Sequence, residues 1–183
     1  MMSIYIRRNE QMKKTISLFC AVILCAVLIL AGGCSGKQPQ ESSQNSNYYL
    51  KADKTEVSPG ETITVYFHID KCERAACFDV TMSVSGNASA GESGFKDNGT
   101  FYTSSSETED GVAFGAYVAE TADILDADFC YVTYTVSEEA EPGSEVTFSA
   151  FAKQFLIGKD ASGAQTDDIT DTVDIAPLVI KVK

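Results

Sequence analysis

The sequence predicts an all-β protein folded as a sandwich of eight or nine strands, and three observations lead to this prediction. Apolar and polar residues alternate in several segments, which is the period of a strand with one buried face. Turn signals separate these segments at intervals of roughly 8 to 12 residues. After residue 47, no stretch shows sustained helical periodicity. With 183 residues, of which 44% are hydrophobic, the chain can support one domain beyond an N-terminal leader.

The first predicted strands each present one apolar and one polar face. Residues 48–52 form a short strand, and Ser58-Pro59-Gly60 marks a turn before the next one. The strands at 61–69 and 77–84 alternate cleanly. Their inward positions are Ile63, Val65, Phe67, Ile69, Phe78, Val80, Met82 and Val84. Their outward positions are Thr62, Thr64, Tyr66, His68, Asp79, Thr81 and Ser83.

Three further strands within residues 111–151 form the centre of the predicted sandwich. An acidic turn at 138–143 separates the second strand from the third, because Pro142 presets φ and Gly143 accepts a positive φ. The three strands bury Val112, Phe114, Ala116 and Val118, then Cys130, Val132, Tyr134 and Val136, then Val146, Phe148 and Ala150.

Two polar stretches are predicted as loops. Residues 86–99 are small and polar, and a short strand follows at 100–103. Residues 158–171 form a second polar loop before the last strand at 178–182.

The N-terminal segment has the features of a secretory signal. Lys13-Lys14 precede an apolar run at 15–30, which is too short for a comfortable membrane span. The run ends in Ala31-Gly32-Gly33-Cys34, which resembles the lipobox of bacterial lipoprotein signal peptides, although Ala31 stands where that family usually has Leu. The resemblance implies cleavage before Cys34 and lipid on its thiol; the alternative is plain secretion with cleavage nearby.

These features divide the chain into three parts. Residues 1–33 are the signal peptide, in which 1–11 reads as an over-extended start before Met12. Residues 34–47 are the lipidated cysteine and a flexible linker rich in Ser, Gln and Asn. Residues 48–183 are the folded domain. We therefore expect a protein anchored to the cell membrane by lipid and facing the extracellular side.

The folded part is strongly acidic. From residue 48 onward it has nine Lys and Arg against 24 Asp and Glu. A field of this sign repels phosphate backbones, which argues against nucleic-acid binding. The acidity either keeps a surface protein soluble or attracts a cationic ligand.

The cysteines and acidic clusters indicate no metal site and no cofactor. Cys72 and Cys77 bracket a predicted loop, so a disulfide between them is sterically permitted. Cys130 occupies an inward position of its predicted strand and is predicted to be a buried free thiol. The sole histidine, His68, is expected to be solvated on the polar side of its strand. The clusters Asp123, Asp126, Asp128 and Asp167, Asp168, Asp171, Asp174 are expected to be solvated loops.

The sequence also argues against an enzyme. It has no Gly-x-Ser-x-Gly motif, no second histidine and no glycine-rich phosphate loop. A pair of carboxylates could serve a glycosidase, but 24 acidic residues produce such pairs by chance.

The strand and turn order resembles a bacterial cohesin module across residues 48–183. The resemblance lies in the segments 59–65, 78–84, 129–136, 141–143 and 159–163. It implies a nine-stranded jelly-roll β-sandwich that binds a dockerin, the calcium-loaded helical module of plant-polysaccharide-degrading enzymes. One departure is Val84-Ser85-Gly86, where cohesins commonly have Tyr-Asp-Pro.

The same resemblance indicates a partner-binding face. Asp79 occupies the position of an outward aspartate on the dockerin-facing strand, and Glu120 that of an acidic contact. The outward residues Ala113, Gly115, Tyr117 and Ala119 would make a nearly flat face on which a helix could lie. The candidate contact residues are Asp79, Thr81, Tyr117 and Glu120, and the alternative is that they form a solvated sheet face.

We therefore expect a lipid-anchored receptor that holds a protein partner, such as a dockerin-bearing enzyme, at the cell surface. One alternative is direct binding of carbohydrate, which usually requires a row of exposed aromatic residues. The chain has no Trp, and Tyr66 and Tyr117 are isolated in the sequence. A second alternative is an adhesion or envelope lipoprotein that resembles cohesins only in architecture.

Overall fold

The computed structural model describes residues 40–41, 46–96 and 99–183. The chain divides into two units, 1–37 and 38–183, and every described residue belongs to the second. The predicted signal peptide and the lipid attachment at Cys34 therefore lie outside the described residues. Among the residues that are described, no helix is long and apolar enough to cross a membrane.

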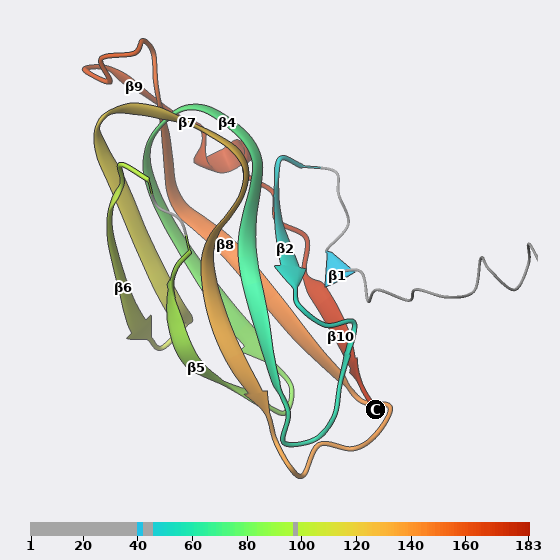
Figure 1. Cartoon of the computed structure of the whole chain (residues 1–183). Coiled ribbons are helices and arrows are strands. Elements are labelled where there is room, and N and C mark those ends of the chain that lie inside the picture. The colour runs from blue at the N-terminus through green and yellow to red at the C-terminus, as the bar shows by residue number, and fades with distance from the viewer. Residues whose placement is uncertain (1–39, 42–45, 97–98) are drawn as a thin grey trace, which may run out of the picture. The chain divides into compact units, whose positions relative to one another are not determined.

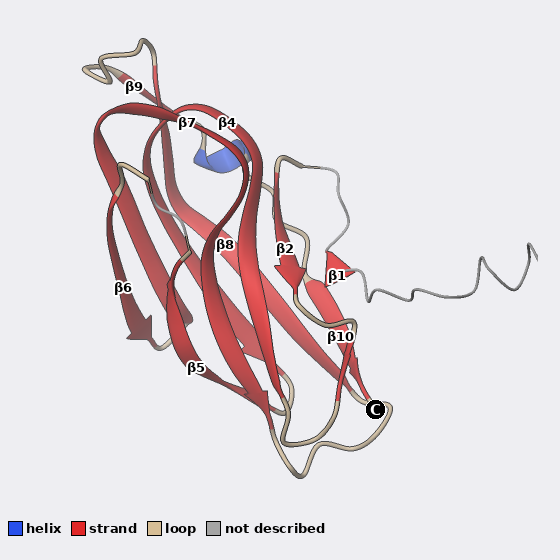
Figure 2. Cartoon of the chain, in the orientation of Figure 1, coloured by secondary structure: helices blue, strands red, loops and turns tan. Residues whose placement is uncertain are grey.

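The described residues form ten strands and one short 3-10 helix (Figure 2). Their order is β1 (Gln40–Glu41), β2 (Tyr48–Ala52), β3 (Glu56–Val57), β4 (Thr62–Ser85), β5 (Ala88–Phe95), β6 (Tyr102–Thr108), β7 (Gly111–Val136), β8 (Glu145–Gly158), β9 (Thr166–Asp168), η1 (Thr170–Thr172) and β10 (Leu178–Val182).

Two long antiparallel strands, β4 and β7, link the two layers of the sandwich. Their pairing runs from Thr62↔Thr135 to Met82↔Val112, with register shifts at Phe67/His68 and between Cys72 and Cys77. Such shifts bend a strand and increase its twist. Both strands arch over at the upper end of the molecule in Figure 1, so each contributes one half to each layer.

Each layer is built around one half of the β4–β7 pair (Figure 1). In the first layer, β2 pairs with the beginning of β4 and β5 with the end of β7, and β1 pairs with β2. In the second layer, β6 pairs with the beginning of β7 and β8 with the end of β4. Strand β8 also pairs with β9 and β10, and β10 pairs in parallel with β3. Apart from β10–β3, all of these pairs are antiparallel. The arrangement in two layers confirms the predicted β-sandwich.

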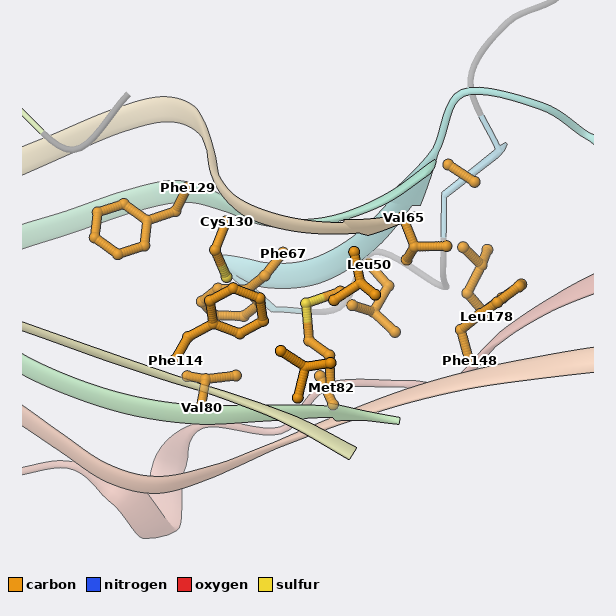
Figure 3. Close-up of a cluster of buried hydrophobic side chains, with 14 of the residues drawn as sticks. Leu50, Val65, Phe67, Val80, Met82, Phe114, Phe129, Cys130, Phe148 and Leu178 are labelled. Atoms are coloured by element: carbon orange, nitrogen blue, oxygen red, sulfur yellow. The ribbon is translucent and has the colours of Figure 1, made fainter. Parts of the chain in front are cut away.

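The core fills the space between the layers (Figure 3). In that view Val65 and Phe67 of the first layer face Val80 and Met82 of the second, and all four are at most 2% exposed. Burial of side chains of this size contributes about 1.5–3 kcal/mol each. A cluster of aromatic rings with centroid separations of 4.2–5.7 Å extends the core toward the bend; it comprises Phe78, Phe95, Phe101, Phe114, Phe129 and Phe155.

The structure confirms most inward positions predicted from alternation. Every one is buried except Val84 and Val118, which are half-buried and pack against the core. Cys130 is a buried free thiol, as predicted. Gly143 has the expected positive φ, at 88°. The first and last predicted strands coincide with β2 and β10.

Three predictions about local structure were wrong. The predicted loop at 86–99 contains β5, an edge strand of mainly small and polar residues, none of them fully buried, that therefore lacks apolar alternation. The segments 61–69 and 77–84 belong to one strand, because the polar stretch between them stays in the ladder to β7. Likewise, the first two of the three strands predicted within 111–151 are the single strand β7. The polar loop at 158–171 contains β9 and part of η1. In addition, two residues of the predicted linker form β1.

Candidate functional site

The outward side chains of β6, β7, β4 and β8 form one continuous surface on the second layer, which we call the outer face. Cross-strand pairing aligns them in rows: Tyr102 lies opposite Tyr117, and Ser104 lies opposite Gly115, which lies opposite Asp79. The residues that define the outer face are Tyr102, Ser104, Ser106, Ala113, Gly115, Tyr117, Cys77, Asp79, Phe151, Lys153 and Gln154.

Two exposed tyrosines stand at one end of the outer face. The rings of Tyr102 and Tyr117 stack with centroids 5.2 Å apart and an interplanar angle of 24°. Both remain well exposed, at 60% and 58%. Tyr117 was predicted as a contact residue but Tyr102 was not, because only the β6–β7 register shows that the two residues are neighbours.

A third exposed aromatic side chain, Phe151, lies on β8. It is 41% exposed, and the Lys153 ammonium lies 5.6 Å from its ring centroid. The ring lies opposite Thr81 on β4. Exposed aromatic residues flanked by a cation are typical of surfaces that bind proteins.

No large side chain projects from the centre of the outer face, because its β7 residues are Ala113 and Gly115. A Cβ added at Gly115 would lie 3.3 Å from the Ser104 hydroxyl oxygen, so the Ser104 side chain lies over this glycine. Asp79 is half-buried beside Gly115 and Gln154. This arrangement places the Asp79 carboxylate on the same sheet face as the two tyrosines.

Cys77 contributes a neutral thiol to the same surface. Burial raises the pKa of this thiol, and the negative charge of Asp79 raises it further. Its Sγ lies 3.7 Å from Gln154 Oε1, as a weak hydrogen-bond donor. A thiol held neutral in this way is a poor nucleophile.

Thr81 does not reach solvent, which corrects its assignment as a contact residue. Its side chain has the predicted outward parity but is fully buried between its cross-strand neighbours Ala113 and Phe151. Its hydroxyl has no hydrogen-bond partner among the described residues. Thr81 therefore lies beneath the surface that a partner would touch.

Glu120 is exposed, as predicted, but lies away from the centre of the outer face. It falls in the stretch of β7 between Tyr117↔Cys77 and Ala122↔Ala75, where pairing with β4 lapses. The next residue, Thr121, donates a hydrogen bond to the Ala161 carbonyl at 3.1 Å, beside the 158–163 loop. The structure thus brings Asp79 and Tyr117 together and places Glu120 at the bend.

The predicted disulfide is not formed in the structure, where Cys72 and Cys77 are free thiols. Both lie within the single strand β4 rather than at the two ends of a loop. Cys72 is buried beside Tyr48, whereas Cys77 contacts Gln154. Because the two sulfurs have different neighbours, closing the bond would require the strand to rearrange.

His68 is buried at 2% exposure, so the expectation that it is solvated was wrong. The register shift between Phe67 and His68 places His68 opposite Asp128, and its Nδ1 lies 2.7 Å from Asp128 Oδ1. The Tyr49 ring covers the imidazole at a centroid distance of 4.7 Å. The alternation of apolar residues places His68 on the outward side of its strand but does not show that another side chain covers it.

The acidic clusters are also more structured than predicted. Asp123 accepts a hydrogen bond from the Arg74 backbone N–H at 2.8 Å. Asp168 accepts hydrogen bonds from the hydroxyl and N–H of Thr170, which lower its pKa. Asp167 lies 3.2 Å from Lys159 Nζ. These carboxylates order the bend and the 158–172 region.

Comparison with known proteins identifies the fold. No family model matches the chain, and no curated protein matches it. One similar solved structure is the sixth cohesin of scaffoldin B from Acetivibrio cellulolyticus, determined in complex with a mutant dockerin. Its TM-score is 0.55 at 13% sequence identity, and the match covers 75% of this chain and 100% of that one.

Two further solved structures give the same result. A non-cellulosomal cohesin from the archaeon Archaeoglobus fulgidus has a TM-score of 0.55 and 12% identity, covering 75% of this chain and 90% of that one. The cohesin module of a family 33 glycoside hydrolase from Clostridium perfringens has a TM-score of 0.53 and 14% identity, covering 76% and 98%. The cohesin-like fold predicted from the sequence is confirmed.

Proposed function

We propose that this protein is a cohesin-like binding module that docks a protein partner on the outer face. The carrying observation is the combination of a cohesin fold with a flat, exposed sheet face bearing the Tyr102–Tyr117 stack. Cohesins of this fold were solved in complex with dockerins. The partner we propose is accordingly a dockerin on a polysaccharide-degrading enzyme.

The shape of the outer face suits a helical partner. Gly115 and Ala113 leave the centre without protruding side chains, so a helix could approach the sheet closely. The exposed rings of Tyr102, Tyr117 and Phe151 provide apolar area that a partner would desolvate. In protein interfaces a few such aromatic residues carry most of the binding energy.

Charge would orient the partner on this face. Asp79 is the carboxylate nearest the centre, and Lys153 provides a cation on β8. A partner with a basic or hydroxyl group opposite Asp79 would pair with it. The net negative charge of the domain would accelerate encounter with a basic partner surface.

A calorimetric titration of the full chain with a panel of dockerins tests this function. We expect one dockerin class to bind, and Tyr117→Ala to weaken that binding more than tenfold. The matched control is Tyr66→Ala, since Tyr66 lies on β4 in the first layer and its ring neighbours Tyr131. No binding by any dockerin, or equal losses in the two variants, would refute the proposal.

Carbohydrate binding is the second candidate, and the Tyr102–Tyr117 stack is the observation that favours it. Tyr117 is isolated in the sequence, whereas the structure places a second exposed ring beside it. A glycan array would separate the two functions. Glycan binding lost in Tyr117→Ala, without any dockerin binding, would make carbohydrate the ligand.

A lipid anchor on Cys34 is the remaining part of the proposal, and it rests on the sequence alone. Lipid at this position would hold the domain on the extracellular side of the cell membrane through the polar linker 35–47. We expect Cys34→Ala to move the protein from the membrane fraction to the soluble fraction. Retention of the variant in membranes would contradict the anchor.

A further inference from the structure

A group of ligand-type side chains lies on the first layer, where the proposed docking function does not use it. His68 and Asp70 come from β4, and Asp126 comes from β7. One ligand atom from each lies within 4.8 Å of the other two. We propose that His68, Asp70 and Asp126 bind a divalent transition-metal ion of the zinc type.

The spacing of the three side chains suits a tetrahedral ion. His68 Nε2 lies 3.3 Å from Asp70 Oδ1 and 3.4 Å from Asp126 Oδ1. Ligands bonded to tetrahedral zinc at about 2.0–2.1 Å are about 3.3–3.4 Å apart. Both distances from the imidazole nitrogen therefore match a tetrahedral ion, and the two carboxylate oxygens lie within 4.8 Å of each other on exposed side chains that can close around it.

The hydrogen bonding of His68 points to the same occupant. Asp128 Oδ1, 2.7 Å from Nδ1, is an acceptor, so Nδ1 carries a proton. In a neutral imidazole, Nε2 then presents a lone pair. Nε2 is buried and has no hydrogen-bond partner within the described ranges. A buried lone pair facing two carboxylate oxygens is unfavourable, and a cation between them removes the conflict.

The surrounding residues orient the ligands as they do in known metal sites. Asp128 fixes the imidazole through Nδ1, which is the carboxylate–histidine–metal arrangement. Lys51 Nζ and Lys96 Nζ lie 3.6 Å and 3.9 Å from the Asp128 carboxylate and balance its charge. The Tyr49 hydroxyl donates to Asp70 Oδ1 at 3.2 Å. The first ligand and its support are therefore already in place.

The donor set selects the class of ion. Calcium and magnesium prefer oxygen ligands, whereas an imidazole suits zinc and its first-row neighbours. Three protein ligands leave a fourth position for water. Asp126 is 92% exposed at its side chain and Asp70 is 50% exposed, so the ion could enter from solvent without unfolding.

A zinc titration of the full chain, stripped of metal with a chelator and dialysed, tests the site. We expect saturable binding of one zinc ion by calorimetry, and a visible absorption band of tetrahedral cobalt when Co²⁺ replaces zinc. Asp126→Asn and Asp70→Asn should each weaken zinc binding at least tenfold. The control Asp110→Asn, an exposed carboxylate in the turn between β6 and β7, should change it less than twofold.

The Asp126→Asn variant keeps the test independent of folding. Asp126 is exposed and has φ 48°, a conformation that Asn also tolerates. His68→Gln alters a buried residue and is therefore a supporting variant only. Absence of saturable zinc binding would overturn the proposal. Equal losses in Asp126→Asn and Asp110→Asn would also overturn it, since binding would then reflect general surface acidity.

Discussion

Tyr102 and Tyr117 face each other across β6 and β7 with their rings stacked 5.2 Å apart, and both rings remain more than half exposed. Because an exposed stack gains little from burial, we expect it to serve binding more than stability. In a double-mutant cycle measured by urea denaturation, the two alanine substitutions should couple by only about 0.5 kcal/mol. A coupling above about 2 kcal/mol would instead make the stack a structural element.

The aromatic core should be far more sensitive than the outer face to loss of a ring. Phe78 is 2% exposed and contacts the rings of Phe101, Phe129 and Phe155. Phe78→Ala should lower the free energy of unfolding by about 3–5 kcal/mol, because a cavity replaces the ring. Phe151→Ala, at a 41% exposed position, should cost less than about 1 kcal/mol. Similar costs for both in denaturant titrations would contradict the assignment of core and face.

Two glycines with positive φ should respond differently to alanine. A Cβ at Gly143, with φ 88°, would meet nothing within 4 Å, so Gly143→Ala should cost only the backbone strain of about 1–2 kcal/mol. A Cβ at Gly111, with φ 132°, would clash with the Met82 carbonyl oxygen. Gly111→Ala must therefore separate β7 from β4 and should cost about 4 kcal/mol. Thermal unfolding of the pair checks this, and equal melting temperatures would be inconsistent with that close approach.

The turn before β4 should contribute a pH dependence to stability. Glu61 accepts hydrogen bonds from Lys54 Nζ at 2.6 Å and from the Ser58 N–H at 3.0 Å, and these lower its pKa from 4.5 to about 2. The folded state binds this proton more weakly than the unfolded state. The stabilising contribution is therefore complete above about pH 4.5 and is lost as the pH falls through 2.

Glu61→Gln should thus reduce stability at pH 7 and flatten the acid limb of the stability curve between pH 4.5 and 2. The control is Glu139→Gln, at an exposed residue of the 138–143 turn. Urea denaturation at several pH values measures both variants. An unchanged acid limb in Glu61→Gln would mean that the Lys54 and Ser58 interactions do not hold in solution.

Much of the fold follows from the alternation of apolar residues. Val65, Phe67, Val80 and Met82 have inward parity in the sequence, and all four lie in the core. Alternation reports burial on one face, so it could not detect β5, none of whose residues is fully buried. It also divided β4 and β7 at their middles, where the alternation is interrupted but pairing between the two strands continues at Cys72↔Ile124 and Ala75↔Ala122.

The candidate site was only partly predictable, because it depends on neighbours that are distant in sequence. Tyr117 could be identified from its outward parity, but Tyr102 required the β6–β7 register. Thr81 has outward parity and is nevertheless covered. The register shift beside Phe67 places His68 opposite Asp128, so this partner could not be identified from either strand alone.

The most direct test of the central claim is amide hydrogen exchange of the full chain with and without a bound dockerin. If the outer face is the docking surface, protection should appear in β6, in residues 111–117 of β7 and in residues 77–83 of β4. The strands β2 and β5 of the first layer should exchange as in the free protein. Protection confined to β2 and β5, with the outer face unchanged, would contradict the account.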